Sequence, residues 1–142
     1  MTMMMSTSLS RRLAFVYALA VIAVSSLPTS RLPDLGGHEI DKLLHFVQYA
    51  VLGYLVSRGW GPGRPAGNRR IGSWLPAVIL LAFAALDESH QRWIPGRSVE
   101  FWDWVADSAG VMVSYSLGVR ANRRMRGFPS PPPLSTRITP RD

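Results

Sequence analysis

The chain alternates between long apolar blocks and short polar segments. Nearly all of its charged residues lie between or beyond four blocks, residues 13–27, 43–56, 74–86 and 104–119. Interfacial Trp, Ser and Gly and single flanking charges extend these blocks to residues 10–28, 40–58, 71–89 and 101–119. A helix of 19 residues is about 28 Å long, close to the thickness of the hydrocarbon core of a bilayer. The pattern therefore predicts four helices long enough to span a membrane.

The third block separates a membrane bundle from a soluble one. Residues 75–86 carry no polar side chain on any face, whereas a helix of a soluble bundle keeps a solvated stripe. Tryptophans flank the blocks, as in the aromatic belts of membrane proteins; they are Trp60 and Trp74 at one set of ends and Trp93, Trp102 and Trp104 at the other. We therefore predict an all-α integral membrane protein with four transmembrane helices in a small bundle. A soluble bundle is the weaker interpretation.

The arginines and lysines predict the orientation of this bundle. Twelve arginines lie in the amino-terminal flank, in the middle loop and after residue 119, and the other two loops hold only four basic residues. Because positive charge collects in cytoplasmic loops, both termini are expected in the cytoplasm. The formal net charge of +7 is then a topological signal. No basic stripe carries aromatic partners for bases, so a nucleic-acid partner is not expected.

The two ends of the chain leave further expectations. Arg11 and Arg12, followed by a short apolar run and Ala23-Val24-Ser25, also resemble a signal peptide with a small-residue cleavage site. Cleavage would leave three spans and would not change the side on which the acids lie. Residues 1–119 form the predicted transmembrane domain. Residues 120–142 are basic and rich in proline, which predicts a disordered cytoplasmic tail.

The acids are distributed very unevenly. Eight of the nine carboxylates fall within residues 34–41 and 87–107, at the predicted outer ends of the apolar blocks. Asp41 and His45 are four residues apart and share a helix face. Glu88 lies at the end of the third block, where the helix dipole disfavours a carboxylate. Asp107 lies about one turn inside the fourth block, so it must pair with His45, Lys42 or Arg97 or be protonated.

We expect these polar residues to converge on an outward-facing pocket. The candidate pocket residues are Asp41, Lys42, His45, Glu88, Gln91, Arg97, Asp103 and Asp107. Among them His45, Glu88 and Asp103 are candidates for general acid and base chemistry. A network that only pins three helices together is the alternative, with an arginine bridged to a carboxylate as its simplest form. A divalent metal held by His45 and carboxylates is chemically permissible, but no ligand spacing of known specificity supports it, so no metal or cofactor is predicted.

At these residues the chain resembles the VanZ-like family of small bacterial membrane proteins. The matching positions run in order along the chain: Asp41-Lys42-x-x-His45-Phe46 with Tyr49 and Leu52-Gly53, then Glu88-x-x-Gln91, Pro95-Gly96-Arg97, and Asp103 with Gly110. One departure is Asp107, where the family pattern usually has asparagine. The resemblance covers roughly residues 13–119. It implies a multipass protein of the bacterial cytoplasmic membrane, related to one associated with reduced susceptibility to a glycopeptide antibiotic.

Three classes of function follow from this sequence. The favoured one is a binding or envelope-modifying protein that recognises a lipid-linked cell-wall precursor or a glycopeptide, with Lys42 and Arg97 contacting phosphate or carboxylate. The second is a membrane-embedded hydrolase or transferase that uses Glu88 or Asp103 with His45. The third is a small proton-coupled transporter with Asp107 and His45 as its relay. The expected partners are therefore the lipid bilayer and a lipid-linked cell-wall precursor or glycopeptide, and no oligomeric state is predicted.

Overall fold

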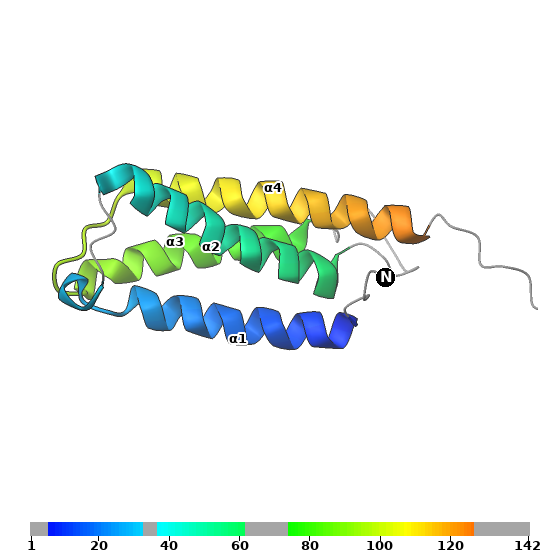
Figure 1. Cartoon of the computed structure of the whole chain (residues 1–142), viewed down its shortest axis with the longest axis horizontal. Helices are drawn as coiled ribbons and strands as arrows, with labels where there is room; N and C mark the ends of the chain where they lie inside the picture. Colours follow the sequence, from blue (N-terminus) through cyan, green and yellow to red (C-terminus); the bar gives the residue numbers. More distant parts are fainter. Residues whose placement is uncertain (1–5, 33–36, 62–73, 127–142) are drawn as a thin grey trace, which may run out of the picture.

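Four helices make up the computed structural model, which describes residues 6–32, 37–61 and 74–126. They are α1 (Thr7–Ser25), α2 (Gly37–Trp60), α3 (Leu75–His90) and α4 (Phe101–Arg126), with single 3-10 turns at Thr29–Arg31 (η1) and Gln91–Trp93 (η2). No strand occurs within these ranges. Successive helices run in opposite directions, so the start of α1 and the end of α4 lie at the same end of the bundle, on the right in Figure 1. The fold is therefore an up-and-down helical bundle, as the sequence predicts.

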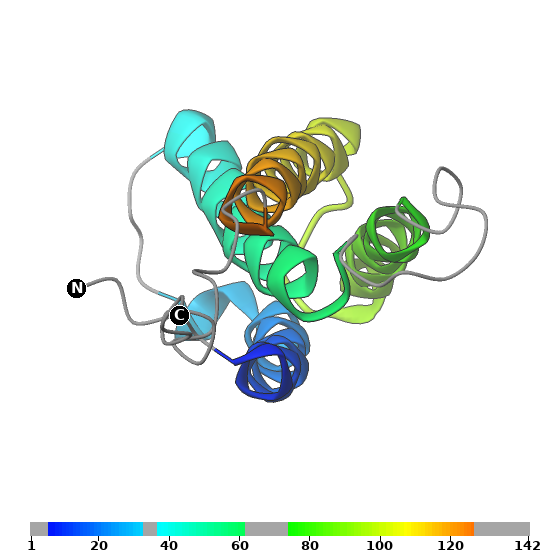
Figure 2. The ribbon, with the colours of Figure 1, turned by 90° about the vertical axis from the view of Figure 1, so that its right-hand side faces the viewer.

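The second helix occupies the centre of the bundle. Figure 2 looks along the helices and shows α2 between α1 and α4, with α3 beside them. The most extensive packing joins α2 to α4, followed by α1 to α2. Tyr49 and Leu52 of α2 and Val111 and Tyr115 of α4 are fully or almost fully buried in the core between these helices. The α2 and α4 pair therefore forms the frame to which the other two helices attach.

Glycines allow α2 and α4 to approach closely. A Cβ atom at Gly110 would collide with the main-chain oxygen of Phe46, and one at Gly118 would collide with the side chain of Ser57. Gly53 of α2 faces Ser114 of α4 in the same way, because a Cβ atom there would collide with the Ser114 hydroxyl. Small residues with this role are typical of helix pairs in membranes, where van der Waals packing replaces the hydrophobic effect between helices.

The helices differ in length from the four predicted segments. Helix α2 has 24 residues and α4 has 26, so both run beyond residues 40–58 and 101–119, whereas α3 has 16. Among the described helices, α1 alone is both long and apolar enough to cross a membrane by length and composition. Acids and bases at the ends of α2 and α4 lower their apolar character. Residues 62–73 of the middle connector and 127–142 of the tail lie outside the described residues.

The distribution of polarity between interior and surface is unusual. Every helix exposes large apolar side chains, for example Phe15 on α1, Leu43 on α2, Leu86 on α3 and Leu117 on α4. In contrast, the interior holds carboxylates, an amide, a histidine and several serines. Soluble monomers rarely expose contiguous apolar patches on this scale. The arrangement suits a bundle whose surroundings are apolar.

Candidate functional site

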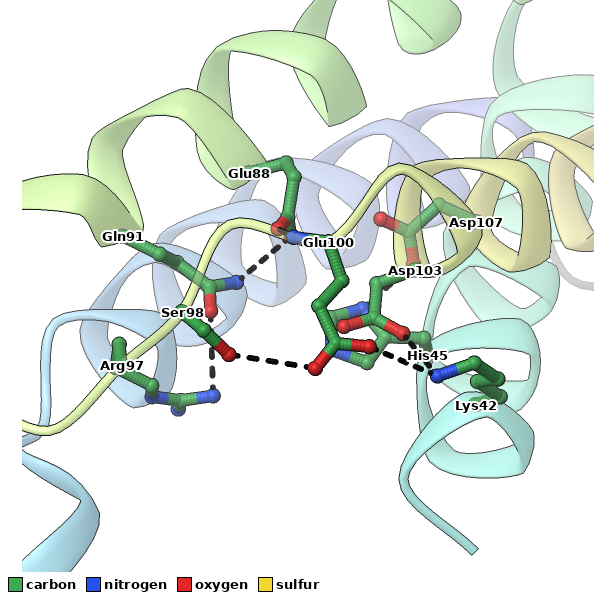
Figure 3. A network of polar contacts seen from close by, with 9 residues as sticks. All are labelled: Lys42, His45, Glu88, Gln91, Arg97, Ser98, Glu100, Asp103 and Asp107. Carbon is green, nitrogen blue, oxygen red and sulfur yellow. Dashed lines mark hydrogen bonds and ion pairs between the residues drawn. The ribbon is translucent and has the colours of Figure 1, made fainter. Parts of the chain in front are cut away.

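The buried carboxylates gather at one end of the bundle, where α2 and α4 begin and α3 ends (left in Figure 1). Figure 3 shows the side chains there, which come from α2, from the carboxyl end of α3, from the connection between α3 and α4, and from α4. Five predicted site residues are buried, namely His45, Glu88, Gln91, Asp103 and Asp107, and a sixth, Arg97, is partly buried. The fold thus brings together residues that are up to 66 positions apart, from Asp41 to Asp107.

Lys42 joins the start of α2 to the start of α4. Its ammonium nitrogen lies 3.1 Å from Oε2 of Glu100 and 3.2 Å from Oδ1 of Asp103. Glu100 was not among the predicted site residues, although it precedes Asp103 by three positions. At this spacing two residues near a helix start share one face, and that spacing is the sequence signal that identifies Glu100.

His45 and Asp107 form a buried pair between α2 and α4. Nδ1 of His45 lies 3.0 Å from Oδ1 of Asp107, and the two residues are 9% and 1% exposed. The sequence left three partners open for Asp107, and the structure selects the histidine. A carboxylate in this position orients the ring and directs the other ring nitrogen away from it.

Glu88 is stabilised by hydrogen bonds from neutral donors. It accepts one from Nε2 of Gln91 at 3.3 Å and one from the main-chain N–H of Glu100 at 2.7 Å. The second donor lies at the amino terminus of α4, where the helix dipole is positive. This contact offsets the unfavourable position of Glu88 at the carboxyl end of α3.

Arg97 contacts protein oxygens other than carboxylates. It donates to Oε1 of Gln91 at 3.4 Å, and to the main-chain oxygens of Val24 at 3.4 Å and Leu27 at 3.5 Å. The expected bridge from arginine to carboxylate is therefore replaced by a relay in which Gln91 lies between Arg97 and Glu88 (Figure 3). Arg97 follows the turn at Gly96, which has φ of +78°, and its guanidinium contacts main-chain oxygens at and just beyond the carboxyl end of α1.

A second buried carboxylate, Asp87, links three helices. Its Oδ2 atom accepts hydrogen bonds from Oγ of Ser25 at 2.9 Å and from the Tyr49 hydroxyl at 3.0 Å. Its Oδ1 atom has no hydrogen-bond partner within the described part of the chain. Asp87, Ser25 and Tyr49 were not among the predicted site residues. They lie on three different helices, so their spacing in the sequence does not show that they meet.

A cavity of about 800 Å³ adjoins this network. Five of the eight predicted residues line it, namely Asp41, His45, Gln91, Arg97 and Asp103, together with Glu100 and apolar side chains of α1 and α2. Lys42, Glu88 and Asp107 are not part of its wall. Its volume falls within the usual range of small-molecule sites, roughly 300 to 1,000 Å³. One atom each from Asp41, His45 and Asp103 also lies within 4.8 Å of the others, a grouping that could hold a metal ion.

A family model described as VanZ/LLP1 matches residues 3–121. The chain belongs to the VanZ/LLP1 family. The resemblance inferred from the ordered motifs is thereby confirmed, and the match includes all four helices up to residue 121. No curated protein and no solved structure matches the chain. In this VanZ/LLP1 protein the charged and amide residues of the motifs lie at one end of the bundle, at the start of α2, the end of α3, the α3–α4 connection and the start of α4.

Proposed function

We propose that this VanZ/LLP1 protein spans the bacterial cytoplasmic membrane four times and binds the polar part of a lipid-linked cell-wall precursor at the outer ends of its helices. The observation that carries the proposal is the cavity, whose lining contains both apolar and charged side chains. Tyr17, Val24, Leu44 and Val47 line it together with the charged residues of the site. A ligand with an acyl part and a hydrophilic part fits such a lining.

The surface of the bundle supports the membrane setting. Helix α1 is apolar enough to span a bilayer, and the other helices also present large apolar side chains outward. Trp93 and Trp102 near the site are 72% and 64% exposed, and Trp60 and Trp74 are exposed at the opposite end. This placement corresponds to two interfacial belts. The arginine distribution then places both termini in the cytoplasm and the cavity toward the outer leaflet.

The charges around the cavity favour a ligand with hydrogen-bond donors. Lys42 is already held by two carboxylates, and Arg97 by two main-chain oxygens and an amide. The carboxylates of Asp41 and Asp103 line the cavity and can accept from amines, amides and hydroxyls. The sugar and peptide parts of a cell-wall precursor carry these donors. A phosphate contact would require Lys42 or Arg97 to exchange one of its present partners.

Binding of a lipid-linked peptidoglycan precursor to protein in nanodiscs tests the proposal. EDTA is present, so that divalent cations do not contribute. We expect Asp41→Asn and Arg97→Gln to weaken binding at least tenfold, about the effect of one lost charge-assisted hydrogen bond. Glu39→Gln and Arg92→Gln are the matched controls, because both side chains are exposed and neither lines the cavity. Equal affinity in the variants and their controls would refute the proposal.

The pairing of His45 with Asp107 favours a second candidate, a membrane-embedded hydrolase or transferase. A histidine oriented by a buried carboxylate is a common general base, and His45 also lines the cavity. Mass spectrometry of the precursor after incubation with the protein would detect turnover. Turnover that His45→Gln abolishes and His90→Gln leaves intact supports an enzyme, whereas an unchanged precursor supports binding alone. The effect on glycopeptide susceptibility suggested by the resemblance stays a prediction.

A further inference from the structure

We propose that Asp41, His45 and Asp103 form a binding site for a divalent transition-metal cation of the Zn²⁺ class. The two α2 residues lie on successive turns of one helix face, and Asp103 comes from the first turn of α4. One candidate ligand atom from each residue lies within 4.8 Å of the other two. All three residues line the cavity.

The separation of these atoms is close to that of a coordinated set. Two ligands held at about 2.1 Å from one metal ion are separated by roughly 3 to 4 Å. The present atoms therefore need to move together by less than about an ångström, which rotation of side chains supplies. Asp41 is exposed at the start of α2, so its side chain has room for this movement.

Asp107 provides a second and independent indication of a metal. It is not one of the three ligands and is almost completely buried behind His45, 3.0 Å from Nδ1 of the ring. Histidines that bind metals almost always donate their other ring N–H to a carboxylate or carbonyl, which fixes the tautomer and strengthens the ligand. With Nδ1 engaged by Asp107, Nε2 is the nitrogen that remains for a metal ion.

The charge at this end of the bundle also favours a cation. Four carboxylates lie at this end: Lys42 contacts those of Glu100 and Asp103, His45 contacts that of Asp107, and that of Asp41 lies close to His45 and Asp103. Lys42 donates to only one oxygen of Asp103, and a carboxylate has a second oxygen for coordination. Lys42 is therefore a competitor that lowers the affinity for a metal ion without blocking the site.

The donor set selects the type of ion. Magnesium and calcium prefer all-oxygen sites, whereas an imidazole suits zinc and its neighbours. Two carboxylates and one imidazole supply three protein ligands, which is the number found in zinc sites that keep an open position. That position faces the cavity, where an anionic or carbonyl oxygen of a bound molecule could complete the coordination.

Titration of the full-length protein with Zn²⁺ alone, in mild detergent without precursor lipid, tests this site. We expect one ion per chain, and at least tenfold weaker binding in Asp41→Asn and in His45→Gln. His90→Gln and Glu39→Gln are matched controls outside the site and should bind as the wild type does. Asp107→Asn keeps all three ligands and should weaken binding by about 10- to 100-fold, as expected for a positioning residue.

Two further measurements keep the test decisive. If His45→Gln loses its helical circular dichroism, Zn²⁺ binding is compared between Asp41→Asn, at an exposed position, and its control Glu39→Gln. Lys42→Met should bind Zn²⁺ several-fold more tightly, because it removes the competing cation. Absence of stoichiometric binding, or equal losses in His45→Gln and His90→Gln, would overturn the metal site. Because the precursor assay contains EDTA, failure of one proposal leaves the other intact.

Discussion

The hydrogen bond from Tyr49 to Asp87 gives the sharpest prediction for stability. Tyr49 is 0% exposed, and its hydroxyl lies 3.0 Å from Oδ2 of the buried Asp87. Oδ1 of the same carboxylate has no partner within the described residues, so the carboxylate depends on the few donors at Oδ2. Tyr49→Phe removes one of these donors and preserves the ring that packs against Phe83.

The expected cost follows from the charge and burial of the pair. A hydrogen bond to a charged group contributes about 1.5 to 3 kcal/mol, and the loss leaves an acceptor that water reaches poorly. The folded-to-unfolded ratio should therefore fall by roughly 10- to 100-fold. Ser25→Ala removes the other donor to Oδ2. Since each single variant keeps one donor, the double variant should lose more than the sum of the two, by about 0.5 kcal/mol or more.

Denaturant unfolding in detergent micelles, followed by helical circular dichroism, measures these differences. Tyr54→Phe is the matched control, because Tyr54 lies on the same helix but is 44% exposed and should change stability by less than about 0.5 kcal/mol. If Tyr49→Phe and Tyr54→Phe unfold at the same denaturant concentration, the Tyr49 hydroxyl does not stabilise Asp87 and the reasoning is wrong.

Three other predictions concern packing, capping and topology. Gly110→Ala should destabilise the bundle by about 1 to 3 kcal/mol, because the new methyl group meets the main chain of Phe46; Ala109→Val on the exposed side of the same turn is the control in a thermal unfolding assay. Arg11→Lys should cost about 1 kcal/mol by loss of the hydrogen bond to the main-chain oxygen of Gly59, and an equal effect of Arg12→Lys in the same assay would contradict this. The chain has no cysteine, so Arg92→Cys and Ala121→Cys can be labelled singly: an impermeant maleimide should reach position 92 in intact cells and position 121 only after permeabilisation, and the reverse would refute the orientation.

The apolar pattern predicts the helices well because their driving force is local. Blocks without charge must be buried in protein or contact lipid along their whole length, and a helix provides hydrogen bonds for all of their backbone groups. The ends are less well predicted. Helix α2 begins at Gly37 and α4 continues through Arg126, because charged residues such as Asp41 and Arg120 are compatible with helical geometry but not with the apolar pattern used to define the blocks. The sequence pattern also does not show which residues of different helices pack together. Gly118 packs against Ser57, for example, although the two are 61 residues apart.

The candidate site was predictable where its residues share a helix face. Asp41 with His45, and Asp103 with Asp107, follow from spacing alone. Contacts between elements were not, because they depend on how the helices are rotated and on the turns that join them. The sequence could not decide among three partners for Asp107. It offered a carboxylate as the simplest partner for Arg97, which instead contacts main-chain oxygens and Gln91. Glu100 contributes both its carboxylate, which pairs with Lys42, and its main-chain N–H, which donates to Glu88.

The pocket and the pinning network, which the sequence presented as alternatives, are two sides of one arrangement. Asp87, Glu88 and Asp107 lie behind the cavity wall and tie the helices together through Ser25, Tyr49, Glu100 and His45. Asp41 and Asp103 belong to the wall itself. Substitution of a residue behind the wall should therefore lower the stability of the fold more than the affinity for a ligand. Substitution of Asp41 should lower the affinity more than the stability. His45 belongs to both groups, since one ring nitrogen is held by Asp107 while the residue lines the cavity. It is the position at which folding and binding are coupled, and comparison of Asp107→Asn with Asp41→Asn separates the two contributions.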